Sequence, residues 1–500
     1  MDLILSILRF LGILFLVIMV FNLMIVVHEW GHFLAGRWRK LKIDRFQIWF
    51  GKPIWSKNIN GVQYGLGWIP FGGFVSLPQM APMEMIEGQQ TAEAEAGTDG
   101  ETPPPPPEPL PPIKPLDKII VAFAGPLFSF LLACFFAVIV YFVGYPDRAT
   151  RDTTIGFIAP DAPAYEAGLR AGDRILSIDG SPIDSWDANI NSVLERLAFS
   201  QGDTIEFTIE RPGEPEPLVL ESGFERDTGT VFRRSGLRTV GGMEPQARVF
   251  VADLVEHGPA QRAGLEPGDE ILTLDGETIY SFRAVIHRVQ SQPGDELVLG
   301  IQRNGVAEEI RVTPEQPLTP ADATPSLGVL FGFDPGDQEE ALSHPSPVRQ
   351  VRESMTMIFR TLGSLVSPSS DVGLQNLAGP VKIANLYYRL FEQPDGWRLV
   401  LWFSVILNVN LAILNMLPLP VLDGGHITLA TIEAIRRGPV NFRALELVQT
   451  FFALALILFM LYVTWFDGLE LLPGRGGGPE PMSFPPPDAA GEVAPATEGS

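Results

Sequence analysis

The sequence His28-Glu29-Trp30-Gly31-His32 closes an apolar run that begins near residue 11. On a helix this spacing puts the two imidazoles one turn apart on one face, where they can bind zinc. The glutamate between them can act as a general base on a water molecule. Polar groups are costly at bilayer depth and are usually functional there. The motif and its position therefore indicate hydrolytic chemistry inside a membrane, with Zn²⁺ as the cofactor.

Four apolar runs reach the length of about 20 residues that a helix needs to span a bilayer. They cover residues 4–34, 119–145, 397–417 and 445–465. The first run lacks the basic start and the small-residue cleavage site of a signal peptide, so we interpret it as a membrane helix. The sequence thus predicts a polytopic α-helical membrane protein with four transmembrane helices, in contact with membrane lipid.

Composition narrows the class of protein further. A chain of 500 residues exceeds one ordinary domain, and 46% of its residues are hydrophobic. The net charge of −23 argues against a nucleic-acid partner. The only cysteine, Cys134, excludes an internal disulfide and a zinc site made of cysteines.

Lysine and arginine near the ends of the spans predict the orientation. They cluster after the first span and between the third and fourth spans, as Arg37, Arg39, Lys40, Lys42, Arg45, Lys52, Lys57, Arg436, Arg437 and Arg443. We expect these loops on the cytoplasmic side. Residues 146–396 then face outward, into the periplasm if the protein lies in a bacterial inner (plasma) membrane.

Residues 43–77 alternate in the manner of strands around Asn60-Gly61, a strong signal for a tight turn. We predict a membrane-associated β-hairpin. Two roles stay open: an ordinary surface hairpin, or a sheet edge beside the metal that binds substrate as an added strand.

Two stretches lack the apolar content for a packed core. Residues 78–117 are rich in Pro and Glu and include five consecutive prolines at 103–107, which predicts a disordered linker. Residues 473–500 are rich in Gly and Pro and are predicted to form a disordered tail.

An internal repeat lies in the outward region. Residues 167–180, AGLRAGDRILSIDG, recur as AGLEPGDEILTLDG at residues 263–276, 96 positions later. Each copy resembles a PDZ domain, and the resemblance implies two inserted α+β modules at 155–215 and 247–316. PDZ domains bind an extended peptide along a sheet edge, often at its carboxyl terminus. Whether these modules bind peptide or only gate by size stays open.

Residues 346–394 carry an amphipathic pattern of helical period. We expect this region to pack on the membrane surface or against the modules and not to span the bilayer.

A hydrolytic zinc site needs a third protein ligand. Pro418 and Pro420 break the third span just before Asp423. The predicted orientation makes the first and third spans run in the same direction, which puts Asp423 at the depth of His28 and His32. His426, one turn after Asp423, could compete for the zinc, but we prefer a hydrogen-bonding role for it.

The motifs HEWGHF and NxxPxPxLDGG (residues 415–425), with a PDZ pair between the second and third spans, resemble the site-2 protease family of intramembrane zinc metalloproteases. The resemblance implies that His28, His32 and Asp423 are zinc ligands and that Glu29 is the catalytic acid/base. It implies that Asn415 holds the substrate or transition state.

Two further stretches carry the same resemblance. Residues 68–77, WIPFGGFVSL, are similar to the family's reentrant hairpin beside the active site. Residues 124–129, AGPLFS, are similar to a second-helix AGPxxN motif. Ser129 stands where that motif has Asn, which weakens the expectation of a polar role there.

The resemblance implies a zinc endopeptidase with its active site near the cytoplasmic side. Its substrates would be single-pass membrane proteins, such as an anti-sigma factor, already trimmed on the outer side. The alternative is a non-catalytic membrane scaffold with tandem peptide-binding modules. The presence of Glu29, the candidate general base, argues against this alternative. The predicted order along the chain is 1–42 (first helix with HExxH), 43–77 (hairpin), 78–117 (linker), 118–146 (second helix), 155–215 and 247–316 (modules), 346–394 (amphipathic region), 397–426 (third helix with LDGG), 445–466 (fourth helix) and 473–500 (tail).

Overall fold

The computed structural model describes residues 2–80, 113–147, 150–187, 190–226, 236–320, 324–334, 342–438, 442–471 and 482–484. The chain divides into two units. Unit 1 holds Met1–Pro146, Leu342–Leu362 and Leu377–Glu470, and unit 2 holds Asp147–Ala341, Gly363–Asn376 and Leu471–Ser500. Most of the predicted linker 78–117 and of the predicted tail 473–500 lies outside the described residues.

Four helices of unit 1 contain a stretch that is long and apolar enough to span a membrane, and these stretches match the four predicted spans. Large apolar side chains such as Leu8 and Phe15 are exposed on the first of them, as expected for a helix in lipid. The helices are α1 (Asp2–Trp38), α4 (Pro115–Val143), α11 (Gly396–Asn415) and α13 (Phe442–Leu471).

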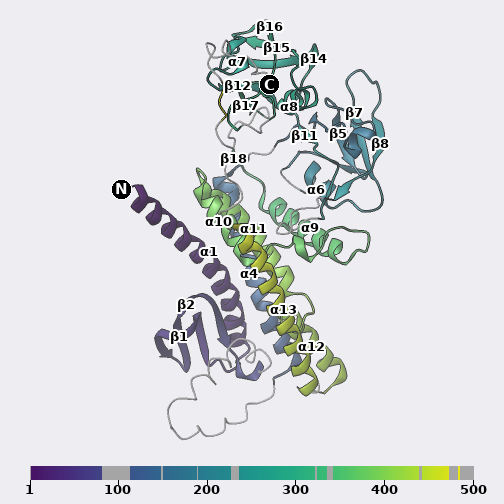
Figure 1. The fold of residues 1–500 in the computed structure, drawn as a ribbon. Helices are drawn as coiled ribbons and strands as arrows, with labels where there is room; N and C mark the ends of the chain where they lie inside the picture. The colour runs from purple at the N-terminus through teal and green to yellow at the C-terminus, as the bar shows by residue number, and fades with distance from the viewer. Residues whose placement is uncertain are drawn as a thin grey trace, which may run out of the picture. The chain divides into compact units, whose positions relative to one another are not determined.

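Helix α4 lies at the centre of unit 1 and packs against α1, α11 and α12 (Asp423–Arg436) (Figure 1). Its buried face carries small residues, among them Ala124, Gly125 and Ala133. A Cβ atom on Gly31 of α1 would lie only 2.3 Å from the carbonyl oxygen of Ala124. Small residues thus let the backbones of α1 and α4 approach closely, as is common between membrane helices.

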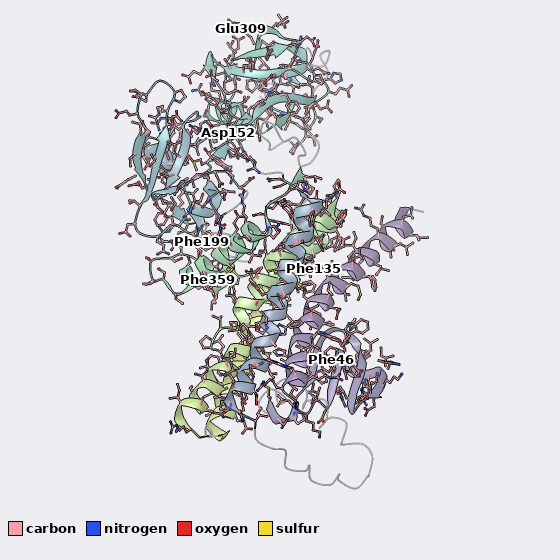
Figure 2. All side chains as sticks on the ribbon, turned by 180° about the vertical axis from the view of Figure 1, so that it is seen from behind. Phe46, Phe135, Asp152, Phe199, Glu309 and Phe359 are labelled. Atoms are coloured by element: carbon pink, nitrogen blue, oxygen red, sulfur yellow. The ribbon has the colours of Figure 1, made fainter. Side chains whose placement is uncertain are left out.

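A β-hairpin follows α1, made of β1 (Arg45–Ile59) and β2 (Val62–Ser76). Asn60 and Gly61 turn the chain with φ angles of 53° and 82°, which suits the twist of the two strands. The ring of Phe46 (Figure 2) lies 5.3 Å from the ring of Phe33 in α1, measured between centroids. The hairpin therefore packs on the end of α1 that carries the HEWGH motif.

Two amphipathic helices precede α11, namely α9 (Pro347–Val366) and α10 (Pro380–Glu392). Tyr387 of α10 is fully buried against α1 and α11, and its hydroxyl lies 2.9 Å from Oγ of Ser404 in α11. We expected residues 346–394 to pack on the membrane surface or the modules. Helix α10 packs on the apolar helices, whereas Asp371, between α9 and α10, forms ion pairs with Arg226 and Arg238 of unit 2.

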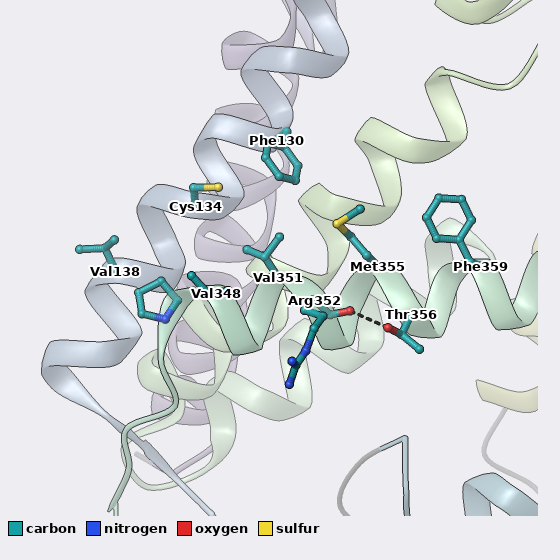
Figure 3. Close-up of a pocket in the computed structure, with 10 residues that line it drawn as sticks. Phe130, Cys134, Val138, Val348, Val351, Arg352, Met355, Thr356 and Phe359 are labelled. Atoms are coloured by element: carbon teal, nitrogen blue, oxygen red, sulfur yellow. Dashed lines mark hydrogen bonds between the residues drawn. The ribbon is translucent and has the colours of Figure 1, made fainter. Parts of the chain in front are cut away.

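The first part of α9 lies against α4. Gln350 Nε2 donates a hydrogen bond of 3.0 Å to the carbonyl oxygen of Ala137. Beside this contact is an almost wholly apolar cavity of about 550 Å³ between the two helices (Figure 3). It is lined by Phe130, Cys134, Val138, Pro347, Val348, Val351, Arg352, Met355, Thr356 and Phe359.

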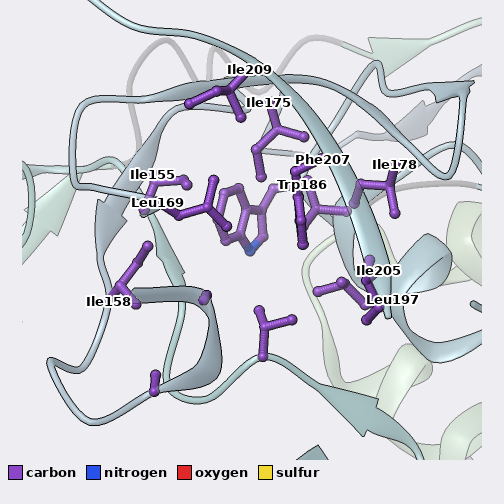
Figure 4. Packing of buried hydrophobic residues seen from close by; sticks show 14 residues of the cluster. Ile155, Ile158, Leu169, Ile175, Ile178, Trp186, Leu197, Ile205, Phe207 and Ile209 are labelled. Atoms are coloured by element: carbon purple, nitrogen blue, oxygen red, sulfur yellow. The ribbon is translucent and has the colours of Figure 1, made fainter. Parts of the chain in front are cut away.

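The first module in unit 2 is a four-stranded sheet in the order β6-β5-β7-β8. Its buried side chains surround Trp186, which is 3% exposed (Figure 4). The core includes Val240, and β11 pairs with β4, so this module extends beyond the predicted boundary at 215. The elements are β4 (Ile155–Phe157), α5 (Pro163–Glu166), β5 (Arg174–Ile178), β6 (Ser181–Pro182), α6 (Val193–Ala198), β7 (Ile205–Glu210), β8 (Leu218–Ser222), β9 (Glu225–Arg226), β10 (Arg238–Thr239) and β11 (Glu244–Pro245).

The second module has the strand order β16-β15-β13-β12-β17, with β14 paired to β13. Its edge strand β17 lies beyond the predicted boundary at 316. The sequence pattern did not predict this strand, because a loop separates it from β16. The elements are β12 (Arg248–Leu254), α7 (Pro259–Arg262), β13 (Glu270–Leu274), β14 (Glu277–Thr278), α8 (Phe282–Ser291), β15 (Leu297–Arg303), β16 (Val306–Val312) and β17 (Val329–Asp334). The remaining short elements are η1 (Pro78–Met80), β3 (Tyr145–Pro146), β18 (Leu342–Ser343) and η2 (Leu374–Asn376).

The repeated Gly-Asp pair has the same structural role in both modules. Asp173 and Asp269 have side chains that are only 1% exposed, and each forms an ion pair with an arginine two strands later, Arg211 and Arg303. A buried carboxylate needs such a partner to offset its desolvation. The repeat is thus explained by the folding of two similar modules.

Candidate metal centre

His28 and His32 lie one turn apart on α1 and both reach α4. His32 Nδ1 lies 2.8 Å from the carbonyl oxygen of Val121. A carbonyl can only accept, so Nδ1 carries the hydrogen and Nε2 of the neutral ring keeps a free lone pair. His28 Nδ1 lies 3.0 Å from Oγ of the fully buried Ser129. Partners of this kind fix the orientation of metal-binding imidazoles.

Asp423 reaches the same place from a break in the chain. Helix α11 ends at Asn415, the next seven residues include Pro418 and Pro420, and Asp423 opens α12. We predicted that Pro418 and Pro420 break the third span within 397–426, and α11 does end before them, because proline lacks the N–H that would continue the helix. Gly424 lies so close to Met416 that a Cβ atom there would come within 2.3 Å of the Met416 carbonyl oxygen. The tight turn therefore brings Asp423 back to the end of α11.

The three side chains converge on one point. Nε2 of His28 lies 3.2 Å from Asp423 Oδ2 and 3.2 Å from Nε2 of His32. Nε2 of His32 lies 3.4 Å from Asp423 Oδ1. Tetrahedral zinc with bonds near 2.05 Å would separate its ligand atoms by about 3.3 Å. The observed separations thus fit the edges of a zinc coordination tetrahedron.

The chemistry of these three side chains also favours a bound cation. His32 and Asp423 are 2% and 8% exposed, and Nε2 of neutral His32 meets the Asp423 oxygens as one lone-pair acceptor beside others. Among the described residues, His28, His32 and Asp423 form the one group of His, Cys, Asp or Glu whose ligand atoms are close enough to hold a metal ion. Two imidazoles and a carboxylate are a known ligand set of catalytic zinc.

Ion pairs join the helix ends beside this centre. Nε of Arg39, just after α1, donates to Asp117 in the first turn of α4 at 2.7 Å. Lys118 of α4 lies 2.8 Å from Glu433 of α12. Both pairs are partly shielded from solvent and tie together the helices that supply the three candidate ligands.

The other predicted site residues lie nearby on the same elements. Glu29 is half-buried next to His28 and interacts electrostatically with the His32 ring. Asn415 is the last residue of α11, half-buried, and its side chain makes no hydrogen bond to the described residues. His426, one turn after Asp423, stays outside the converging group, and its ring makes no hydrogen bond within the described part of the chain. The preferred hydrogen-bonding role for His426 stays a prediction.

Three residues gain a role that the sequence reasoning missed. Ser129 is hydrogen-bonded to His28, although its departure from Asn had weakened the expectation of a polar role. Gly125 faces the ligand atoms, since a Cβ atom there would lie 2.2 Å from Nε2 of His32. Asn22, six residues before His28, donates at 3.2 Å to the carbonyl oxygen of Pro70 and holds β2 against α1. The apolar helical setting of Asn22 was the available signal.

Comparison with known proteins supports a common ancestry for nearly the whole chain. The regulator of sigma-E protease RseP of Escherichia coli K12 is 27% identical over 89% of this chain and 95% of its own. The corresponding protein of Haemophilus influenzae is 27% identical over 90% of this chain and 96% of its own. A relative in Vibrio cholerae, 26% identical over 86% of this chain and 92% of its own, has "zinc metalloprotease" in its name.

A PDZ domain of an SdrC-like protein from Listeria innocua is 28% identical and covers 17% of this chain and 92% of its own length, with a TM-score of 0.15. At that TM-score the likeness does not establish the fold of either module.

The model of the family described as Peptidase family M50 matches residues 15–459, which include His28, His32 and Asp423. The family's metalloprotease activity agrees with the buried group of two imidazoles and a carboxylate. The chain belongs to peptidase family M50, the site-2 protease family.

Proposed function

We propose that this protein is an intramembrane zinc endopeptidase that cuts the transmembrane segment of single-pass membrane proteins already trimmed on the outer side. The observation that carries the proposal is that Asp423 converges on His28 and His32, which lie in α1, a helix long and apolar enough to span a bilayer. Ionisable groups at such a depth are rare and mark functional sites.

The chemistry follows from the residues around that centre. Zinc held by His28, His32 and Asp423 would supply a Lewis acid that polarises the scissile carbonyl and acidifies water. Glu29 takes the proton from the attacking water and passes it to the leaving amine. Val121 and Ser129 keep both imidazoles in the orientation that directs Nε2 toward the centre.

The substrate has to present an extended peptide, because a helix uses its own backbone groups. Residues 45–48 and 63–66 of this sheet are paired on both sides. Among the described residues, 53–59 of β1 and 73–76 of β2 pair on one side only, so each keeps an outer edge for an added strand. Asn22 anchors Pro70 of β2 six residues before His28, or roughly 9 Å along α1 at the usual helical rise. The half-buried amide of Asn415 is the second group that we assign to holding substrate.

The location and orientation rest on charge. Basic residues after α1 and after α12 occur at the helix ends that Arg39–Asp117 and Lys118–Glu433 join. The positive-inside rule places these ends in the cytoplasm, so the candidate centre lies near the cytoplasmic side of a bacterial inner membrane. Both modules of unit 2 then face the periplasm.

We assign substrate selection to the two modules. They exclude an intact ectodomain by size, and a newly exposed carboxyl terminus can add to a strand edge such as β17. An anti-sigma factor shortened by an earlier cut is a substrate of the required kind, and the named function of the sigma-E regulators among the relatives is consistent with it.

A cleavage assay in lipid vesicles tests the proposal. The panel contains several single-pass substrates, each in two forms, with its outer domain intact and with that domain trimmed. The full chain should cut only the trimmed form. A chain in which residues 150–334 are replaced by a flexible linker, with ends chosen outside β4 and β17, should cut both. Rejection of the intact form by the shortened chain, with normal cutting of the trimmed form, would refute selection by the modules. Failure of the full chain to cut any trimmed form would refute the protease assignment.

A further inference from the structure

A short segment that follows α13 in sequence lies on the second module. Ser483 pairs antiparallel with Thr319. The amide of Leu318 donates to the carbonyl oxygen of Ser483 at 2.8 Å, and the amide of Ser483 donates to the carbonyl oxygen of Thr319 at 3.1 Å. Residues 482–484 therefore form main-chain hydrogen bonds within the range 473–500, which we predicted to be a disordered tail.

Phe484 anchors this segment. It is 4% exposed, whereas the neighbouring Ser483 is exposed. A Cβ atom on Gly328 would lie 2.9 Å from Cε2 of Phe484 and 3.3 Å from Cα of Gly258. The ring thus rests where the loop after β12 meets the loop before β17, and only glycine leaves room for it at position 328. An aromatic ring is the side chain that gains most from such burial.

The receiving surface is built by the module itself. Glu315 and Ser326 exchange two main-chain hydrogen bonds of 3.0 and 2.9 Å, and Glu315 forms an ion pair with Arg262. The amide of Ala260 donates to Leu327, and the amide of Val255 donates to Gly328, at 3.0 and 2.8 Å. These bonds fix the surface without help from residues 482–484.

We propose that residues 482–484 are a peptide ligand carried by the chain itself, and that their docking ties the chain after α13 to the second module. Recognition combines strand pairing with one aromatic anchor. In peptides that bind as added strands, main-chain hydrogen bonds give affinity and side-chain pockets give specificity. The proposal goes beyond the protease function, because neither the metal centre nor the hairpin takes part in it.

The docking limits the reach of the chain after α13. Eleven residue steps separate Leu471 from Met482, so the tether reaches at most about 40 Å.

Hydrogen exchange on the full-length protein in detergent tests the docking. Phe484→Ala should speed exchange of the Leu318 amide at least about tenfold. The matched control Ser483→Ala, which keeps the main-chain bonds and changes only an exposed side chain, should stay within about twofold of wild type. Amides of β13 and β15 should be unchanged in both variants. Exchange at Leu318 that is equal in wild type and Phe484→Ala would overturn the proposal. Faster exchange throughout β13 and β15 would also overturn it, because Phe484 would then be part of the module's core.

A peptide supplied in trans tests whether the segment acts as a ligand. A synthetic peptide of residues 478–490 is added to the Phe484→Ala protein at several millimolar, the effective concentration that a short linker provides. It should restore at least half of the lost protection at Leu318, and the same peptide with alanine at the position of Phe484 should restore none. Equal results with the two peptides would contradict the proposal. Zinc content and cleavage of a trimmed substrate are followed in parallel, so that loss of docking is distinguishable from failure of the protease assignment.

Discussion

The Cα atom of Gly125 faces His32 so closely that a Cβ atom built on Gly125 would lie 2.2 Å from Nε2 of His32 and 2.8 Å from Nε2 of His28. Neither Gly125 nor His32 can move away easily. The His32 ring is fixed by its hydrogen bond to Val121, one turn before Gly125 on the same helix. The wall of the candidate metal centre opposite the imidazoles is therefore backbone.

Gly125→Ala should abolish zinc binding, because the added methyl group occupies the space where the ligand atoms converge. Zinc content of the detergent-solubilised protein, measured after dialysis, checks this. Gly12→Ala is the matched control, since a Cβ atom at position 12 of α1 meets nothing within 4 Å. Full zinc occupancy in Gly125→Ala would show that the ligand atoms do not converge beside α4.

Asp423→Ala should lower zinc occupancy, because it removes one of three protein ligands and leaves a polar hole. His426→Ala should retain the metal, since its ring lies outside the converging group. Metal analysis of the two variants side by side decides between the carboxylate and the imidazole. Depletion in His426→Ala with full zinc in Asp423→Ala would reverse the assignment.

Ser129→Ala should weaken zinc affinity by roughly 10- to 100-fold, the usual cost of losing a partner that orients a ligand. The hydroxyl lies 3.0 Å from Nδ1 of His28 and is fully buried. Competition with a chelator of known affinity measures the change. Ser129→Asn should keep an affinity nearer to wild type than Ser129→Ala, because an amide can also hydrogen-bond to the ring. An affinity unchanged in Ser129→Ala would remove the orienting role.

Asp371 should make the attachment of residues 367–376 to the first module sensitive to acid. Burial raises the pKa of Asp371, but hydrogen bonds from Arg226 and Arg238, at 2.8 and 2.7 Å, outweigh it and lower the pKa below its ordinary value. A lowered pKa gives stabilisation that is complete well above the unfolded-state value of about 3.9 and is lost as the pH falls through the folded-state value.

Hydrogen exchange of residues 367–376 at pH 6 checks this acid sensitivity. Asp371→Asn should lower the free energy of local opening of residues 367–376 by on the order of 1–3 kcal/mol at pH 6. In this variant, acidification should lower it little further. The control Glu309→Gln changes an exposed carboxylate on β16 (Figure 2) and should behave as wild type. Equal protection of wild type and Asp371→Asn at pH 6 would contradict the prediction.

Local patterns predicted what depends on local geometry. The four-residue spacing of His28 and His32 predicted two imidazoles on one helical face, and both do reach α4. The approach of Asp423 to them was predicted from the directions of two spans, which are themselves a consequence of chain connectivity and charge. The break before Asp423 was predicted from Pro418 and Pro420, but two prolines signal where a helix ends and not where the next helix begins.

Contacts between distant segments were beyond the sequence pattern. Gly125 is one of many glycines, and only its distance to His32 shows its role. Tyr387 is the residue through which α10 packs against α1 and α11. An amphipathic pattern predicts an apolar side of a helix but not the surface that this side packs against. Phe484 is a single aromatic residue in a segment rich in proline, where composition alone predicted disorder.

Glu29→Gln in the full-length, zinc-loaded protein tests the central claim most directly, because glutamine keeps the size of the side chain and removes only its capacity to accept a proton. Cleavage of a trimmed single-pass substrate in lipid vesicles and zinc content are measured on the same preparations. We predict full zinc occupancy with cleavage slowed by at least about 10²- to 10⁴-fold, the usual cost of losing a general acid/base. Near-normal cleavage by zinc-loaded Glu29→Gln would contradict the assignment of proteolysis to this centre.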